Sequence, residues 1–428
     1  MLECKGMRRK VQDFIATIKD EKLQKTFENC FYSTLDTTVK MEEDGTAYVF
    51  TGDISAMWLR DSSAQVIHYL GFVNEDEDVR RVIKGMIERQ LFYIRLDPYA
   101  NAFNEFDNNR GHKGDLTDHN PWVWERKFEI DSLCYPIFLA DRYYKVSGDA
   151  SIFGDSFKET VKVILDTFTT EQDHHEKSSY RHFRPGDPPE FSVPCEGKGG
   201  PVARTGMIWS GYRPSDDACE YGYFIPGNMF AVVILGMLAE IFTSVAPDEE
   251  LRTRAQALRE EIEAGIQKYG VIDHPKFGKM YAYEVDGLGG VNLMDDANVP
   301  SLLSLPYLGY CGAEDELYQN TRRFVLSPEN RFYFKGKYLE GVGSPHTPPN
   351  YVWHIGVIMQ ALTSDDPAEV NRCLKLVLST DAGKCLMHEG VDVNDPTQYS
   401  REWFAWANSL FAYFLLTKKD LLKDHFHA

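Results

Sequence analysis

Two loops rich in acidic and aromatic residues are the parts of this sequence best equipped for chemistry. WSGYRPSDDACEY, residues 209–221, places Asp216 beside Asp217, and MHEGVDVNDPTQYSREW, residues 387–403, carries Glu389 on an irregular stretch. Adjacent carboxylates on a turning loop point to different sides, so one can face a reacting atom while the other binds. Two carboxyl groups from distant loops are what glycoside hydrolysis requires, because one protonates the departing oxygen and the other activates water or attacks the sugar.

A third polar stretch, TGDISAMWLRDSSAQ, begins at residue 51 and runs into an apolar helical pattern. It contains Asp53, Trp58, Arg60 and Asp61 within nine positions. A forked guanidinium group and a carboxylate are suited to sugar hydroxyl groups, and an indole ring is suited to the apolar face of a sugar. The stretch therefore predicts a carbohydrate-binding edge at the entrance to a helix.

Metal-dependent chemistry is the main competing interpretation, since residues 294–298 (MDDAN) and 104–109 (NEFDNN) are rich in oxygen ligands. Neither has the spacing of a calcium loop, and no histidine pair at helical spacing indicates zinc. The sequence also lacks a dinucleotide fingerprint, a phosphate-binding loop and a serine-hydrolase elbow. We expect neither a metal nor a cofactor.

The composition limits the classes of partner. The chain has 428 residues, 43% of them hydrophobic, and a net charge of -19. A charge of this sign disfavours nucleic acid and anionic membrane surfaces. Without a leader-like apolar segment or a run that approaches a membrane span, we expect a cytoplasmic protein, a monomer or a weak homo-oligomer. The eight cysteines have no CxxC spacing and are expected to be reduced, buried thiols.

The elements that must position these residues are helical. A period near 3.6 predicts about twelve helices. Every second helix is more apolar and follows a long loop rich in Asp, Glu, Trp, His, Gly and Pro, whereas the others follow short turns. This alternation predicts an all-α (α/α)6 toroid of six helical hairpins, a single domain over residues 1–428 with loops lining one central pocket. The predicted helices cover about 7–33, 62–73, 77–96, 128–147, 151–171, 227–244, 248–269, 298–309, 313–326, 350–363, 367–380 and 401–418.

Two further segments are expected to be β-rich or irregular. One is a hairpin that turns through Asp44 and Gly45. The other, residues 173–206, is too long for a bare connection, and we expect it to form a lid that closes one side of the pocket.

Several of these stretches closely resemble glycoside hydrolase family 125, the exo-acting α-1,6-mannosidases. They are TGDISAMWLRDSSAQ, WSGYRPSDDACEYGYFIPGNMFAVV, MDDANVPSLLSLPYLGY, GSPHTPPNYVWHIG and MHEGVDVNDPTQYSREWFAWANSLF, which follow one another from about residue 51 to about residue 414. The resemblance implies an (α/α)6 barrel and a metal-independent, inverting removal of terminal α-1,6-linked mannose from oligosaccharides or trimmed N-glycans. It also implies a site organised like that of the glucoamylases, which lie in the same clan.

Carried onto this sequence, the resemblance makes Asp216 the general acid, with Asp217 as the alternative or a ligand, and Glu389 the general base. Arg60 and Asp61 would hold the hydroxyl groups of the terminal mannose, with Trp58 packed nearby. For the two histidines among the further candidates, a place in the hydrogen-bonded pocket wall is an equal alternative. These further candidates for substrate binding are Asp53, Trp124, Glu125, Arg126, Arg213, Asp295, Asp296, Asn298, His346, His354 and Trp403.

Two other functions remain open at this level. One is a different (α/α)-barrel glycosidase, such as a calcium-dependent α-1,2-mannosidase. The other is a sugar-binding toroid that has lost its catalysis. The partner class expected under the leading interpretation is α-1,6-linked mannosides and oligosaccharides.

Overall fold

Two kinds of helix, one apolar all round and one amphipathic, alternate along the chain and build the fold. The computed structural model describes residues 2–188 and 191–427. Helix α9 (Ile225–Ser244) is buried on nearly every face, whereas α10 (Glu249–Gly265) buries one stripe. A helix that is apolar all round must be enclosed, and an amphipathic helix covers a core with one side. Of this pair, α9 accordingly lies in the interior and α10 packs on its outer side.

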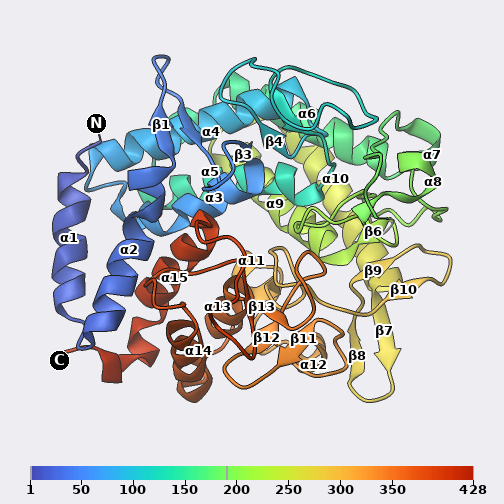
Figure 1. Cartoon of the computed structure of the whole chain (residues 1–428). Helices are drawn as coiled ribbons and strands as arrows, with labels where there is room; N and C mark the ends of the chain where they lie inside the picture. The colour runs from blue at the N-terminus through green and yellow to red at the C-terminus, as the bar shows by residue number, and fades with distance from the viewer. Residues whose placement is uncertain (1, 189–190, 428) are drawn as a thin grey trace.

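The helices that are buried on most faces form an inner ring in which α3 contacts α5, α5 contacts α9, α9 contacts α11, and α13 contacts α15. Helix α15 in turn packs on α3 and on α2, so the last hairpin closes onto the first. The amphipathic helices lie outside this ring (Figure 1). The predicted all-α toroid is confirmed. The inner helices are α3 (Leu59–Val66), continued by a 3-10 turn (Ile67–Phe72), α5 (Ile130–Ser147), α9, α11 (Leu305–Leu308), α13 (His354–Leu362) and α15 (Ala405–Lys418). The outer helices are α2 (Glu21–Thr37), α4 (Glu77–Leu96), α6 (Asp155–Glu171), α10, α12 (Glu316–Val325) and α14 (Pro367–Ser379).

Short strands fix the entrances to the inner helices. Strands β3, β6 and β13 each lead directly into α3, α9 and α13, and each is paired with a neighbouring strand. An isolated bridge between Gly52 and Phe404 does the same immediately before α15. The predicted hairpin is confirmed as the antiparallel pair β1 and β2. The strands are β1 (Val39–Met41), β2 (Ala47–Val49), β3 (Met57–Trp58), β4 (Ala102–Phe103), β5 (Val123–Glu125), β6 (Tyr223–Phe224), β7 (Val271–His274), β8 (Gly278–Tyr281), β9 (Glu284–Val285), β10 (Val291–Asn292), β11 (Tyr333–Lys335), β12 (Glu340–Val342), β13 (Tyr351–Trp353) and β14 (Gly390–Asp392).

The outer and inner helices also differ in how their N-termini are capped. Five of the outer helices start from an aspartate whose side chain accepts a hydrogen bond from the first turn, which compensates the unpaired N–H groups there. The six inner helices have no such side-chain cap. Their unpaired N–H groups are left at the end of the ring where the long loops gather. The capping residues are Asp20, Asp76, Asp248, Asp315 and Asp366.

Two predicted helices differ from the structure. The region 7–33 is two helices, α1 (Lys5–Ala16) and α2, because Asp20 caps a new helix by accepting from Leu23 N–H at 2.7 Å. The region 298–309 is helical only at α11. The buried Asp295 carboxylate accepts from the N–H groups of Leu302 and Leu303, which holds that backbone in a turn rather than a helix.

Two smaller expectations need correction, and a third is met in part. Helix α9 has the length and hydropathy of a membrane span, which the sequence analysis overlooked; 78% of its most apolar window is buried against other parts of the protein. Cys195 is exposed, and Cys311 and Cys385 are partly exposed, so the thiols are not all buried. Within its described part, the segment 173–206 holds only the short helices α7 (His174–Lys177) and α8 (Pro194–Gly197) and is otherwise irregular.

The contact between α5 and α9 gives a test of inner-ring packing. Phe230 of α9 is fully buried, and its ring meets the edges of Tyr135 and Phe138 with centroids 5.1 and 5.3 Å apart. We expect Phe230→Ala to lower the free energy of unfolding by about 3–5 kcal/mol, because it leaves a cavity in the ring. Phe106→Ala, at a side chain 54% exposed, should change it by no more than about 0.5 kcal/mol. Denaturant unfolding of both variants measures the difference, and equal losses would contradict this account of the packing.

Candidate active site

A cavity of about 340 Å³ lies where the loops before the inner helices converge. Its wall combines four acidic or amide side chains with four large aromatic side chains, the mixture suited to a sugar. The lining residues are Thr51, Ile54, Trp58, Arg60, Asp61, Pro214, Ser215, Asp216, Asn298, His346, Thr347, Pro348, Trp353, Glu389, Ser400, Arg401, Phe404 and Trp406. The three loops singled out in the sequence therefore meet at one cavity.

The adjacent acids of the 209–221 loop diverge. Asp216 has a φ of 67° and lies in a tight turn, in which its N–H donates to the carbonyl of Arg213 at 2.9 Å. An aspartate tolerates this left-handed conformation better than most residues do. Asp216 faces the Arg60 side, while Asp217 accepts from Ser215 at 2.9 Å and contacts His346 at 3.2 Å. The expectation that the two carboxylates point to different sides is met.

Arg60 joins the acid loop to the inner helices. It is only 3% exposed, and its Nη1 donates to Glu129 at 2.6 Å and to Asp131 at 3.1 Å. Its Nη2 lies 3.5 Å from Asp216 Oδ1. A buried guanidinium needs partners of this kind, because an unpaired buried charge is very costly. Arg60 thus orients Asp216 as well as lining the cavity.

Asp61 and Trp58 also face the cavity. Asp61 accepts from Thr51 Oγ1 at 2.7 Å, and burial raises the pKa of its carboxyl group. Within the described part of the chain, Trp58 Nε1 and Arg60 Nε have no hydrogen-bond partner although both are buried. Buried donors are rarely left unpaired in folded proteins, so these two are available to the oxygens of a ligand.

Glu389 is held from the other side of the cavity. Ser400 Oγ donates to its Oε2 at 2.8 Å, and Arg401 Nη1 lies 3.5 Å from its Oε1. Arg401 also pairs with Asp53, and its Nε lies 2.9 and 3.1 Å from the two carboxylate oxygens. Asp53 therefore does not line the cavity itself; it anchors the arginine that positions Glu389.

Two of the predicted ligands are arginines that face other parts of the protein. Arg126 donates to Asp97 at 2.7 Å, and Arg213 donates to the buried Glu284 at 2.5 Å. Neither lines the cavity. Arg213 instead holds β9, the strand that pairs with β6 at the entrance to α9, so these two predicted binding residues have structural contacts in place of a position in the cavity.

The side chains of Asp295 and His354 also accept hydrogen bonds from the backbone. Burial raises the pKa of Asp295 to about 8 and lowers that of His354 to about 3. His354 Nδ1 accepts from the backbone N–H of His388, next to Glu389. His354 is thus the hydrogen-bonded wall residue that was the alternative to a ligand, and it supports the base loop.

The remaining predicted residues divide between the wall and its surroundings. Asn298 lines the cavity, and Asp296 holds it by accepting from its side chain at 2.9 Å. Glu125 lies behind Asp216; burial opposes the shift, yet Lys127 and Arg184 lower its pKa. Trp124 packs behind Trp58 outside the cavity. Trp403, which is 37% exposed, lies on the outer surface, and Trp353 and Trp406 provide the indoles of the cavity in its place.

The segment 173–206 does not close this cavity, contrary to our expectation. None of its described residues lines it. Phe183, Asp187 and Phe191 line a neighbouring cavity of about 790 Å³, which extends behind the acid loop. The small cavity owes its shape to the loops before the inner helices instead.

Sequence reasoning missed several residues that matter here. Arg401 and Ser400 precede the last helix in the stretch that was singled out for Glu389, and only the fold shows that they contact Glu389. Asn101 and Glu129 were not considered, although both touch the acid side of the site. Glu129 lies directly before the apolar helix α5, where a polar loop enters the inner ring, and that position was an unused signal.

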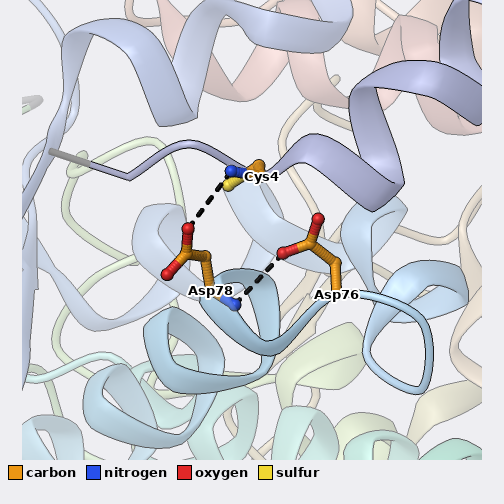
Figure 2. A group of neighbouring side chains, drawn as sticks. All are labelled: Cys4, Asp76 and Asp78. Atoms are coloured by element: carbon orange, nitrogen blue, oxygen red, sulfur yellow. Dashed lines mark hydrogen bonds between the residues drawn. The ribbon is translucent and has the colours of Figure 1, made fainter.

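One group of side chains resembles a metal site but is explained by hydrogen bonds. Among the described residues, possible ligand atoms of Cys4, Asp76 and Asp78 lie within 4.8 Å of one another (Figure 2). Asp76 caps α4 and accepts from Met7 N–H at 3.0 Å, and Asp78 accepts from the N–H groups of Glu3 and Cys4. These carboxylates fasten the N-terminal segment to α4, and none of the three residues lines the cavity.

Comparison with known proteins identifies the family. The family model of metal-independent α-mannosidases (GH125) matches residues 20–416. The chain belongs to this family. A Schizosaccharomyces pombe relative, the meiotically up-regulated gene 157 protein, is 39% identical over 99% of this chain and 87% of its own length.

Solved structures agree with this assignment. A Streptococcus pneumoniae metal-independent α-mannosidase, in a non-productive complex with α-1,6-mannobiose, is 46% identical. It covers 98% of this chain and 99% of its own, with a TM-score of 0.95. A bacterial glucoamylase complexed with acarbose shares the fold at 13% identity and a TM-score of 0.55, over 86% of this chain and 49% of its own. This GH125 chain is a glycoside hydrolase that acts on α-mannosides.

The ion pair at the rim of this α-mannosidase can be tested by titration. Burial alone would lower the pKa of His346, but the Asp217 carboxylate raises it from 6.5 to about 9. The pair therefore stabilises the fold fully below about pH 6.5 and loses that contribution as the pH rises to about 9. NMR titration of the imidazole should give a pKa well above 6.5, and Asp217→Asn should lower it. An unchanged pKa in Asp217→Asn would contradict the pairing.

Proposed function

We propose that this GH125 enzyme removes terminal α-1,6-linked mannose by a single, inverting displacement. The observation that carries the proposal is the position of the two carboxyl groups in the ring. Asp216 precedes α9, the third inner helix, and Glu389 precedes α15, the sixth, so the two approach one cavity from opposite sides. Carboxyl groups on opposite sides leave room for a water molecule between the sugar and the base, which is the arrangement of inverting enzymes.

In the proposed reaction, Asp216 Oδ2 donates its proton to the glycosidic oxygen as the bond to the anomeric carbon breaks. Glu389 takes a proton from water as the water oxygen bonds to the opposite face of that carbon, which gives β-mannose. Hydrogen bonds from Ser400 and the nearby Arg401 orient Glu389 for this step. Trp58, Arg60 and Asp61 hold the terminal sugar.

The size of the cavity favours action at a chain end. At about 340 Å³ it is near the lower limit of ligand pockets, which run from about 300 to 1,000 Å³. Such a space suits one terminal sugar better than the middle of a chain. The α-1,6 linkage is proposed because the 46% identical S. pneumoniae enzyme binds α-1,6-mannobiose.

We further propose that the natural substrates are mannose oligosaccharides or trimmed N-glycans met in the cytosol. Cell fractionation followed by immunodetection tests the location, and recovery of the protein in a secreted or membrane fraction would overturn it.

The first prediction concerns the product. With α-1,6-mannobiose and EDTA present, proton NMR in the first minutes should show β-mannose, because water attacks the face opposite the leaving group. α-Mannose as the first product would indicate a retaining enzyme with a carboxylate nucleophile. Release from an α-1,2 but not an α-1,6 mannobiose, dependent on calcium, would favour the alternative α-1,2-mannosidase.

The second prediction concerns the acid. Asp216→Asn and Glu389→Gln should each lower kcat at least about a hundredfold, because each removes a proton transfer. Asp217→Asn is the matched control at the neighbouring carboxylate and should retain far more turnover. Thermal unfolding of all three variants checks the fold. A large loss in Asp217→Asn with turnover kept in Asp216→Asn would reverse the assignment within the pair.

A further inference from the structure

Asn101 is a buried residue that joins the acid loop to the entrances of two inner helices. It lies directly before β4, the middle strand of the sheet β3-β4-β5, and its backbone carbonyl accepts from Leu59 N–H at 3.1 Å. Strand β3 leads into α3, which carries Arg60, and β5 lies shortly before α5. Asn101 is fully buried and does not line the cavity. Its backbone is therefore fixed by the elements that carry the acid side of the site.

Hydrogen bonds fix the orientation of the Asn101 side chain. Its Oδ1 accepts from the backbone N–H of Lys127 at 3.1 Å, which leaves the nitrogen on the other side. That nitrogen, Nδ2, lies 3.1 Å from Asp216 Oδ1, 3.1 Å from Glu125 Oε2 and 3.4 Å from Glu129 Oε1. A reversed amide would turn its oxygen toward three carboxyl groups and its N–H groups toward an N–H donor. The amide nitrogen is therefore the group that faces Asp216.

The two hydrogens of this amide suffice for two of the three carboxyl groups. The shorter contacts are those to Asp216 and Glu125. Glu129 is already an acceptor, since Arg60 donates to it at 2.6 Å and Ser132 at 3.0 Å. One hydrogen of Asn101 is thus available for Asp216.

The bond from Asn101 distinguishes the two oxygens of Asp216. Among the described residues, the nitrogens that contact this carboxyl group are Asn101 Nδ2 and, at 3.5 Å, Arg60 Nη2, and both lie on Oδ1. The side chain of Asp216 is 23% exposed and lines the cavity, and Lys127 Nζ holds its backbone carbonyl at 2.7 Å. Oδ1 can accept from an amide whether or not Oδ2 carries a proton, so the bond orients Asp216 in both states.

We propose that Asn101 is a positioning residue for the general acid: it holds Oδ1 of Asp216 so that Oδ2 faces the glycosidic oxygen. Asn101 transfers no proton itself. Its effect is on geometry, because a proton donor must lie within hydrogen-bonding distance of the oxygen that it protonates. The inference rests on the proposed role of Asp216 as the acid.

The test compares two substrates that differ in their need for a proton. The sugar that leaves from α-1,6-mannobiose must be protonated, whereas the fluoride of α-mannosyl fluoride departs as an anion. Attack by water is the same for both. We expect Asn101→Ala to lower kcat/KM on mannobiose at least about tenfold and to keep kcat/KM on the fluoride within about threefold of wild type.

Asn104 provides the matched control, since it is the same residue type three positions further along and is also buried. Its amide donates to the backbone carbonyls of Arg110 and Pro121, each at 3.0 Å, rather than to a carboxyl group. Any effect of Asn104→Ala should therefore be equal on the two substrates. Equal losses on both substrates in Asn101→Ala, or undiminished hydrolysis of mannobiose, would overturn the proposal.

A crystal structure of the wild-type enzyme tests the positioning without a variant and without activity. In a complex with the sulfur-linked analogue of α-1,6-mannobiose, the Asp216 oxygen that faces the sulfur should be the one that Asn101 does not contact. The opposite arrangement, or an Asn101 turned away from Asp216, would overturn the inference. A wild-type enzyme that neither binds the analogue nor hydrolyses mannobiose would count against the proposed function instead, and the unliganded crystal would still show whether Asn101 holds Asp216.

Discussion

The buried guanidinium of Arg60 is the contact on which the acid side of the site depends. It lies among the carboxyl groups of Asp61, Glu129, Asp131 and Asp216, from two inner helices and the acid loop. Ion pairs removed from water do not stabilise a fold by default, since desolvation offsets much of their attraction. This cluster instead fixes α3, α5 and the loop relative to one another, because displacing any of them would leave a buried charge without its partner.

Glu389, on the other side of the cavity, is held by a different kind of contact. Glu389 is oriented by a serine and by Arg401, and Arg401 is itself held by Asp53 from the first third of the chain. Asp216 lies beside the deeply buried Arg60, whereas Glu389 depends on Arg401 and Asp53, whose side chains are partly exposed. The inner helices present uncapped N-termini to both, and the partial positive charge there favours the concentration of acids at this end of the ring.

Much of this could be predicted from the sequence because it follows from local pattern. The alternation of apolar and amphipathic helices predicted the ring, and the loops containing Asp61, Asp216 and Glu389 do line one cavity. The sequence did not predict which way individual side chains point. Arg126 and Trp403 have suitable side chains in suitable loops, but Arg126 turns to Asp97 and Trp403 to the outer surface. Trp406 lies in one of the stretches that resemble the family but was not among the predicted ligands, and Glu129 depends on contacts between elements that no local pattern encodes.

The packing of α15 on α2 and α3 closes the ring, and this has a consequence for how the enzyme folds. Asp53 and Arg401 are 348 positions apart, and the bridge between Gly52 and Phe404 joins the same two regions. Contacts this distant form late and slowly, because a long loop must close before they are made. The residues that hydrogen-bond to or pair with Asp216, namely Arg60, Asn101 and Lys127, lie within the first three hairpins. A nascent chain can therefore position its proposed proton donor before the loop of Glu389, the proposed base, has been made. A chain whose ring is still open therefore lacks one of the two carboxyl groups proposed for catalysis, so hydrolysis is expected only once the last hairpin has closed.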